Sequence, residues 1–205
     1  MQTFSQNREQ EFIFNYFGDF VGNFMDLGSN DGITLSNTWA LALHGWHGIL
    51  VDASPKAFER LKKNYEGNER VVLLNCAVGS IKGDMVLSES GELLGQGDVA
   101  LVSSFKYEET KRWESINMPF ENVIVPMVRF EEILEKAGSS NFDLISIDIE
   151  GMEKEVVPQI DFAALKTRMA IIEFNGKDED FFTNHMNQFG FKLIHKNAEN
   201  LIYTI

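Results

Sequence analysis

The residues of this sequence that could do chemistry stand at the ends of apolar runs. The first group is the segment Asp26–Gly32, whose spacing Asp-x-Gly-x-x-x-Gly differs from the Gly-x-Gly-x-x-Gly of dinucleotide sites. Glycine lets a backbone turn sharply and approach a ligand closely, and a turn between a strand and a helix presents free backbone N–H groups. Taken alone, the segment is equally typical of a ligand-binding loop and of a turn that binds nothing.

The second group is Asp52 with Ala53, which follows the short apolar run Gly48–Val51. A carboxylate at the end of a strand can accept hydrogen bonds from both hydroxyls of a ribose. The competing role is capping of the helix that follows, but Ser54 already suits that role. We therefore favour ribose binding for Asp52.

The third group, Asn75, Cys76 and Ala77, follows the next apolar run, where the edge of an adenine ring would lie. A buried cysteine is usually a small packing residue, and we expect that role for Cys76. The group therefore indicates the adenine side of a nucleotide site and not a reactive thiol.

The fourth group is the pair Asp148 and Glu150, at the end of another apolar run. Alternation along a strand would place both side chains on one side. Two carboxylates at a strand end can bind a metal, raise each other's pKa or act as a general base. The pair is equally typical of acidic residues at a helix N-terminus, which the helix dipole favours.

The elements that must position these groups alternate between strands and helices. Apolar runs and their breakers predict strands at 23–27, 48–52 and 71–76, and helices at 34–44 and 56–65. Ser54 suits the cap of the second helix, with Pro55 as its first residue, whereas Ser36 or Asn37 could cap or interrupt the first helix. This order implies parallel strands with right-handed crossovers.

The rest of the chain continues the alternation of strands and helices, but it ends in an antiparallel hairpin. Residues 1–22 are predicted to form a helical lead-in that is amphipathic over 4–17. Further strands are expected at 85–88, 123–128, 142–147 and 169–174, with helices at 130–137, 152–160 (interrupted at Pro158) and 178–189, and an antiparallel hairpin of 191–195 and 201–205. Residues 91–97 are glycine-rich, and 103–117 fit no element; long loops are usually functional or disordered.

Five α/β units and a closing hairpin predict an α/β fold with a mostly parallel seven-stranded sheet, with residues 1–205 as one domain. This topology resembles the Rossmann-like class I fold of methyltransferases that use S-adenosyl-L-methionine (AdoMet), in which the last strand enters antiparallel. A dinucleotide dehydrogenase would be expected to end in another strand–helix unit.

The composition of the chain disfavours some classes of binding partner. The 31 acidic and 18 basic residues give a net charge of −13, which argues against a nucleic-acid backbone or an anionic membrane as partner. Cys76 is the only cysteine, so no disulfide forms within the chain, which fits a reducing compartment and a cytoplasmic location. The sequence start does not have the pattern of a signal peptide, and no apolar stretch reaches the length of a membrane span.

Several motifs in order make the resemblance more specific, because they are similar to those of FkbM-type methyltransferases. The matching segments are Ser5-Gln6 with Glu9, Met25–Asp31, Ser36–Thr38, Gly45–Asp52, Asn75–Gly79 and Ser146–Glu153. Two positions depart from the family pattern: Gln10 stands where an acidic residue is usual, and Asp52 where glutamate is common. The middle of the chain, 80–119, carries little of the resemblance and is expected to determine the acceptor.

The resemblance implies transfer of a methyl group from AdoMet to an oxygen nucleophile, often a hydroxyl of a sugar or a polyketide. We expect Asp148 and Glu150 to be catalytic, and Gln6 and Asn37 to bind a small-molecule or glycan acceptor. The cofactor is expected to contact Asp26, Gly28, Ser29, Asn30, Asp31, Gly32, Asp52, Ala53, Asn75, Cys76 and Ala77. No metal is assigned, and the oligomeric state is left open.

Three alternatives follow from the same residues. The first is a methyltransferase that uses a divalent metal bound by Asp148, Glu150 and a residue such as Glu173 or Asn175, since hard cations favour oxygen ligands. The second is a module that binds AdoMet or a nucleotide sugar without catalysis. A nicotinamide oxidoreductase ranks third, because the first glycine spacing and the terminal hairpin do not fit it.

Overall fold

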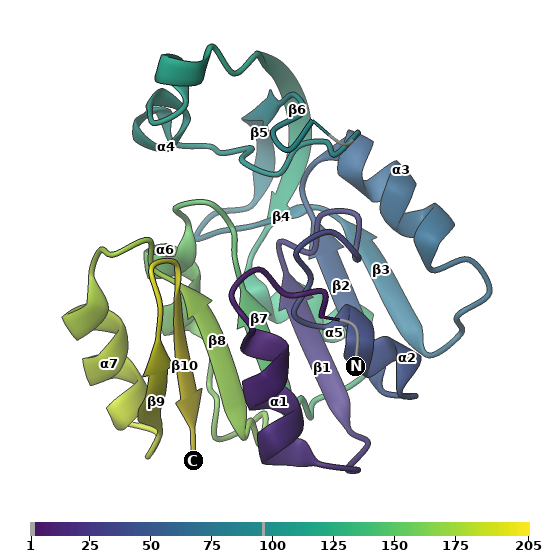
Figure 1. The fold of residues 1–205 in the computed structure, drawn as a ribbon, viewed down its shortest axis with the longest axis vertical. Coiled ribbons are helices and arrows are strands. Elements are labelled where there is room, and N and C mark those ends of the chain that lie inside the picture. Colours follow the sequence, from purple (N-terminus) through teal and green to yellow (C-terminus); the bar gives the residue numbers. More distant parts are fainter. Residues whose placement is uncertain (1–2, 96) are drawn as a thin grey trace.

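A seven-stranded sheet forms the centre of the computed structural model, which describes residues 3–95 and 97–205 (Figure 1). Its strand order is β3-β2-β1-β7-β8-β10-β9, and β10 alone runs antiparallel to its neighbours. The strands are β1 (Asn23–Leu27), β2 (His47–Asp52), β3 (Val71–Asn75), β7 (Leu144–Ile147), β8 (Met169–Glu173), β9 (Lys192–Lys196) and β10 (Asn200–Thr204). This order confirms the predicted mostly parallel sheet with its C-terminal hairpin.

Helices cover both faces of this sheet, which gives three layers. One face packs against α1 (Glu9–Phe17), α2 (Trp39–Leu43) and α3 (Pro55–Asn64), and the other against α5 (Phe130–Ala137), α6 (Glu153–Val156) and α7 (Glu179–Asn187). Strands buried on both faces explain the nearly continuous apolar runs of the sequence. No helix within the described residues is both long enough and apolar enough to cross a membrane.

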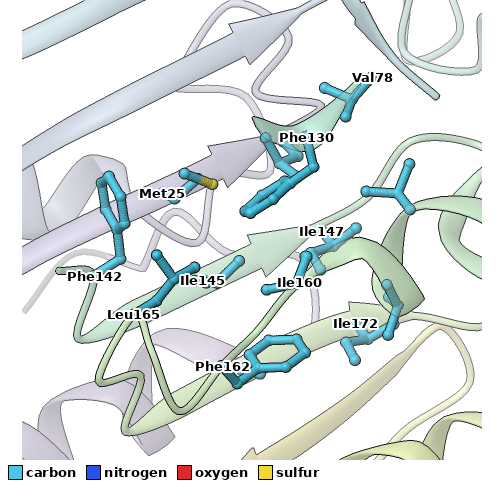
Figure 2. Packing of buried hydrophobic residues seen from close by; sticks show 14 of the residues in the cluster. Met25, Val78, Phe130, Phe142, Ile145, Ile147, Ile160, Phe162, Leu165 and Ile172 are labelled. Atoms are coloured by element: carbon cyan, nitrogen blue, oxygen red, sulfur yellow. The ribbon is translucent and has the colours of Figure 1, made fainter. Parts of the chain in front are cut away.

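The larger core lies between the sheet and α5, α6 and α7. Figure 2 shows Met25 of β1, Ile145 and Ile147 of β7, and Ile172 of β8 packed among the rings of Phe130 and Phe162. The side chains of these residues are almost fully buried. Burial of a side chain of this size contributes about 1.5–3 kcal/mol each, so this layer fixes the positions of the central strands.

The helix after the glycine turn is shorter than predicted. It begins at Trp39 and not at Thr34, so the predicted start is wrong by more than one turn. Asp31 accepts hydrogen bonds from the backbone N–H of Ile33 and Thr34, and the Ser36 hydroxyl accepts from the N–H of Trp39. Side chains that bond nearby backbone groups compete with helix formation, which keeps residues 31–38 in turns.

The N-terminal lead-in also contains less helix than predicted. The α1 helix begins only at Glu9, whereas the amphipathic pattern indicated residue 4. Residues 1–2 of the lead-in, and residue 96 of the glycine-rich stretch, lie outside the described residues. Farther along the chain, the helix expected over 152–160 is divided into α6 and a 3-10 turn, η2 (Val157–Gln159), at the predicted interruption near Pro158.

A second, smaller sheet, which sequence patterns did not indicate, stands beyond the carboxyl ends of the strands of the large sheet (Figure 1). Its strands are β4 (Ala77–Val78), β5 (Gly83–Ser90) and β6 (Phe120–Val128). The unassigned segment 103–117 contains α4 (Tyr107–Lys111) and the 3-10 turn η1 (Glu114–Ile116). The strands predicted at 85–88 and 123–128 are therefore present, but they pair with each other outside the large sheet.

The carboxyl ends of β1 and β7 meet with very little space between their backbones. The N–H of Asp148 donates to the carbonyl of Leu27 at 2.9 Å. Gly28 has a φ of +86°, and a Cβ at this position would lie 1.6 Å from the carbonyl oxygen of Asp148. Only glycine fits here, because the strand ends occupy the space of any side chain.

We predict that Gly28→Ala destabilises the fold much more than Gly45→Ala. Both glycines have positive φ, but a Cβ on Gly45 would meet no atom of residues 3–95 and 97–205 within 4 Å. The control should therefore lose only the conformational cost, about 1–2 kcal/mol, whereas Gly28→Ala should lose a further ~2–4 kcal/mol as backbones separate. Urea unfolding measures both values, and equal losses would show that the contact between the strand ends is unimportant.

Candidate active site

A cavity lies at the carboxyl ends of β1, β2, β7 and β8, beneath the smaller sheet and the segment that joins β5 to β6. Its floor comes from the strand ends and the glycine turn, including Asp26, Gly28, Asp52 and Asp148. Residues of the segment 100–113 and Leu87 of β5 line the opposite side. Ligands of open α/β sheets bind at this edge, so the cavity is the candidate active site.

The glycine turn places two buried polar atoms at the cavity without a hydrogen-bond partner. The N–H groups of Gly28 and Ser29 donate to the carbonyl of Val51, and the N–H of Asn30 donates to Asp52. Among the described residues, the hydroxyl oxygen of Ser29 and the amide oxygen of Asn30 have no partner, although both residues are buried. Buried polar atoms are nearly always bonded, so these two are suited to a ligand.

Asp52 is held rigidly at the end of β2. One carboxylate oxygen accepts from the N–H of Asn30 at 2.7 Å and the other from the N–H of Ser54 at 2.8 Å. The Ser54 hydroxyl caps α3 as predicted, since it accepts from the N–H of Ala57. Each carboxylate oxygen has two lone pairs, so Asp52 keeps capacity to accept bonds from a ligand.

Three predicted cofactor residues lie outside the lining of the cavity and serve the scaffold. Asp31 accepts from the N–H groups of Ile33 and Thr34, and the amide of Asn75 donates to the carbonyl of Asp52 at 2.9 Å. A Cβ on Gly32 would lie 2.5 Å from the ring of Tyr65. These residues therefore stabilise the turn and the end of β2 from outside the cavity.

Ala53, Cys76 and Ala77 do line the cavity beside Asp52. Burial raises the pKa of the Cys76 thiol to about 11, so the thiol is protonated near neutral pH. Cys76 also belongs to the large apolar core, in agreement with its expected packing role.

Asp26 is a second buried acid on the cavity floor. Its carboxylate accepts from the Thr38 hydroxyl at 2.5 Å. Burial raises the pKa of Asp26 to about 7, the bond from Thr38 opposes this rise, and the charge of Asp52 adds to it. Asp26 therefore holds the turn at Thr38 and can carry a proton near neutral pH.

Asp148 and Glu150 converge with Glu173 from β8, and one oxygen of each lies within 4.8 Å of the others. The explanation by strand alternation is wrong, because β7 ends at Ile147 and Glu150 has a φ of +49°. A turn held by Glu153, which accepts from the N–H groups of Ile149 and Gly151, points the carboxylates together. The predicted convergence is therefore present, but a turn produces it.

Burial and mutual repulsion raise the pKa values of this cluster. Burial raises the pKa of Asp148 to about 6, although a hydrogen bond with Glu173 opposes the rise. Burial, followed by the charge of Asp148, holds the pKa values of Glu150 and Glu173 well above their usual range. The positive charge of Arg112 has the opposite effect on Glu150. Carboxyl groups with raised pKa values are suited to accept or donate protons near neutral pH.

The remaining lining of the cavity contains both residues that the sequence predicted and residues that it did not. Gln6 and Asn37 both line it, and the Asn37 amide donates to the Ser146 hydroxyl at 3.1 Å. Arg112, Trp113 and Glu199 also line the cavity. Sequence reasoning did not find these three, because they belong to an irregular segment and a hairpin turn without a recognisable motif.

Comparisons with known proteins concern the family and the fold of the chain. The family model of the methyltransferase FkbM domain matches residues 26–193. A solved FkbM methyltransferase from Methylobacillus flagellatus is similar in fold, with a TM-score of 0.57 and 12% identity over 90% of this chain. This chain covers only 44% of that protein. A comparison with curated protein sequences gives no significant match.

Two other solved structures share the fold at low identity. The N-terminal domain of human METTL16, solved with S-adenosylhomocysteine (SAH), has a TM-score of 0.50 and 12% identity, covering 94% of this chain and 66% of its own. A candidate RNA methyltransferase from Pyrococcus horikoshii has a TM-score of 0.50 and 13% identity, covering 96% of this chain and 82% of its own. At these identities the similarity concerns the fold alone.

We predict that the free energy of unfolding falls as the pH rises from about 4 to about 7. Asp52 and Asp148 have pKa values near 6 in the folded chain and an ordinary value of 3.8, so the folded chain binds more protons in this window. Glu173→Gln should flatten the fall by an amount on the order of 1 kcal/mol. Urea unfolding at several pH values measures it.

The matched control for this pH series is Glu11→Gln. Arg8 lowers the pKa of the exposed Glu11, whereas burial raises the pKa values of the buried acids. Glu11 therefore stabilises the folded chain more as the pH rises, and its removal cannot flatten the fall in the free energy of unfolding. Stability that rises across the window, or a Glu173→Gln profile identical to the wild type, would contradict the protonated cluster.

Proposed function

The chain belongs to the family of FkbM-domain methyltransferases, and from this premise we propose that it uses AdoMet to methylate a hydroxyl of a small molecule or glycan. The observation that carries the proposal is the convergence of Asp148, Glu150 and Glu173 beside the cavity that the glycine turn and Asp52 line. Because the chain spans less than half of the FkbM methyltransferase it matches, the activity of a whole protein is part of the proposal.

The residues on the cavity floor fit AdoMet. Asp52 has free lone pairs for the ribose hydroxyls, and the unpartnered oxygens of Ser29 and Asn30 supply further polar contacts. Cys76 and Ala77 offer the small, apolar surface that an adenine ring needs. When bound, AdoMet supplies a methyl group on a sulfonium, which is already an activated electrophile.

The chain itself must orient the acceptor and remove its proton. We assign Glu150 as the general base, because its raised pKa makes it a stronger base than an exposed glutamate when it is ionised. Asp148 and Glu173 surround it and share a hydrogen bond. General bases contribute about 10²–10⁴ in rate, and fixed alignment contributes up to ~7–11 kcal/mol in the best cases.

The charge of the cavity favours neutral or cationic acceptors. Six acidic residues line it, whereas Arg112 is the only cationic one among the described lining residues; the acids are Asp26, Asp52, Asp148, Glu150, Glu173 and Glu199. Such a site repels phosphates. This disfavours RNA as acceptor, even though a candidate RNA methyltransferase shares the fold.

A divalent metal at the same carboxylates is the competing form of this function. Asp148, Glu150 and Glu173 are oxygen ligands close enough together for a hard cation. The shared hydrogen bond and the positive charge of Arg112 offer a way to balance the cluster without a metal. Sensitivity of turnover to chelators therefore distinguishes the metal-assisted form from the metal-free form.

We predict that Asp52→Asn weakens AdoMet binding by about tenfold to a hundredfold, since a hydrogen bond to a charged group contributes ~1.5–3 kcal/mol. Equilibrium dialysis with radiolabelled AdoMet measures the change. The control is Asp84→Asn, on an exposed residue of the smaller sheet. Unchanged affinity in Asp52→Asn would remove Asp52 from the ribose site.

We predict that Glu150→Gln lowers turnover by about 10²–10⁴ while AdoMet affinity stays the same, because a neutral amide cannot accept the proton. Labelled methyl transfer from AdoMet into a metabolite and glycan extract of the source cells is the assay. The control is Glu108→Gln, on an exposed residue of α4. Full turnover in Glu150→Gln would exclude it as base.

The same assay with EDTA separates the two forms of the proposal. In the metal-free form, wild-type turnover is unchanged by the chelator and by added magnesium. Loss of turnover with EDTA and its recovery with magnesium would instead establish the metal-assisted form, with the three carboxylates as ligands.

A further inference from the structure

Glu9 is a buried carboxylate that joins two distant parts of the chain. Its side chain is 0% exposed, although it opens α1 near the surface. One oxygen accepts from the N–H of Asn7 at 2.8 Å, and the other accepts from the side-chain amides of Asn197 and Asn200 at 2.7 and 2.9 Å. Within the described residues, no ion pair includes Glu9, so amide N–H groups alone balance this carboxylate.

The bonds from Glu9 fix the turn between β9 and β10. The side-chain oxygen of Asn197, whose amide contacts Glu9, accepts from the N–H groups of Glu199 and Asn200 at 2.9 and 2.6 Å. The N–H of Asn197 in turn donates to the carbonyl of Asn200. The position of residues 197–200 therefore depends on the carboxylate of Glu9.

From this turn, hydrogen bonds continue to the carboxylate cluster. The carbonyl of Glu199 accepts from the N–H groups of Phe174 and Asn175 at 2.7 and 3.1 Å. The side-chain amide of Asn175 donates to Glu173 at 2.7 Å. Glu173 is one of the three clustered carboxylates. An unbroken series of hydrogen bonds thus connects Glu9 to the catalytic end of the cavity.

A second branch reaches the cavity through the N-terminal segment. The side-chain amide of Asn7, the residue whose N–H contacts Glu9, donates to the Glu199 carboxylate at 2.7 Å. Gln6, which precedes it, and Glu199 both line the cavity. The carboxylate of Glu9 therefore bonds the residue next to Gln6, and through Asn7 it reaches Glu199 as well as the support of Glu173.

We propose that Glu9 is a positioning residue for the acceptor end of the site, which it organises through the 197–200 turn and Asn7. The proposal rests on the proposed methyl transfer. The cofactor end, with Asp52 and the glycine turn, is held by bonds to Val51 and Ser54 and is outside this series. Loss of Glu9 should therefore affect acceptor methylation and leave AdoMet binding intact, a selectivity that a general loss of stability would not produce.

The experiment compares Glu9→Ala with the wild type in three measurements. Hydrogen–deuterium exchange at the amides of Phe174 and Asn175 should become about tenfold faster, as expected when a supporting hydrogen bond is lost. AdoMet affinity should stay within about twofold, while labelled methyl transfer into the cell extract should fall by about tenfold or more. Glu9→Gln, which keeps one acceptor oxygen, should be intermediate.

The control is Glu11→Ala, on the same helix but exposed and bonded only to Arg8 among the described residues. It should match the wild type in all three measurements. Asn200→Ala removes one donor to Glu9 without changing α1 or the bonds of the Asn197 side chain, and it should reproduce the effect if Glu9→Ala does not fold. Unchanged exchange at Phe174 and Asn175, or a fall in AdoMet affinity parallel to methylation, would overturn the proposal.

The exchange measurement also separates this proposal from the proposed function. If the wild type neither binds AdoMet nor labels the extract, methyl transfer fails, and the role of Glu9 in it fails as well. If the wild type is active and the exchange rates of Glu9→Ala are normal, only the positioning role fails.

Discussion

The close contact of two backbones at the ends of β1 and β7 is the constraint on which the site depends. The carbonyl of Asp148 occupies the place that a side chain at Gly28 would need. Parallel strands have their carboxyl ends at one edge of the sheet, and this contact sets the spacing between the ends of β1 and β7. The same contact places Asp148 near enough to Asp26 and Asp52 for their charges to raise its pKa.

The acids gathered at this edge lower the stability of the folded chain, but their raised pKa values are typical of groups that transfer protons. Burial raises the pKa values of Asp26, Asp52 and Asp148, so ionising them in the folded chain costs free energy. Backbone N–H groups and hydroxyls compensate some of this cost, as at Asp52. Glu150 and Glu173 have less compensation, and strongly shifted carboxyl groups in a cavity are typical of functional sites.

Local signals in the sequence predicted the elements that depend on local physics. Ser54 and Pro55 correctly indicated the start of α3, since a cap and a fixed φ act within one turn. The smaller sheet could not be predicted in the same way, because β5 and β6 are joined by a long irregular segment and pair only in the folded chain. The short α2 shows that side-chain bonds from Asp31 and Ser36 can override a helical pattern.

The sequence predicted the residues on the floor of the candidate site, but not the lining residues that come from irregular segments. Motifs placed Asp52 and Asp148 at strand ends, and the parallel sheet then brought them together. Arg112, Trp113 and Glu199 reach the cavity only through tertiary packing of irregular segments. The sequence suggests Glu173 only as a metal ligand, since no sequence pattern indicates that β8 ends beside β7 with its acid facing Asp148.

If the cavity binds AdoMet, titration calorimetry of the wild-type chain will detect it. AdoMet and SAH are each titrated into the protein near neutral pH. We expect saturable binding of both compounds to one site per chain. Absence of binding for both compounds would show that the cavity is not an AdoMet site.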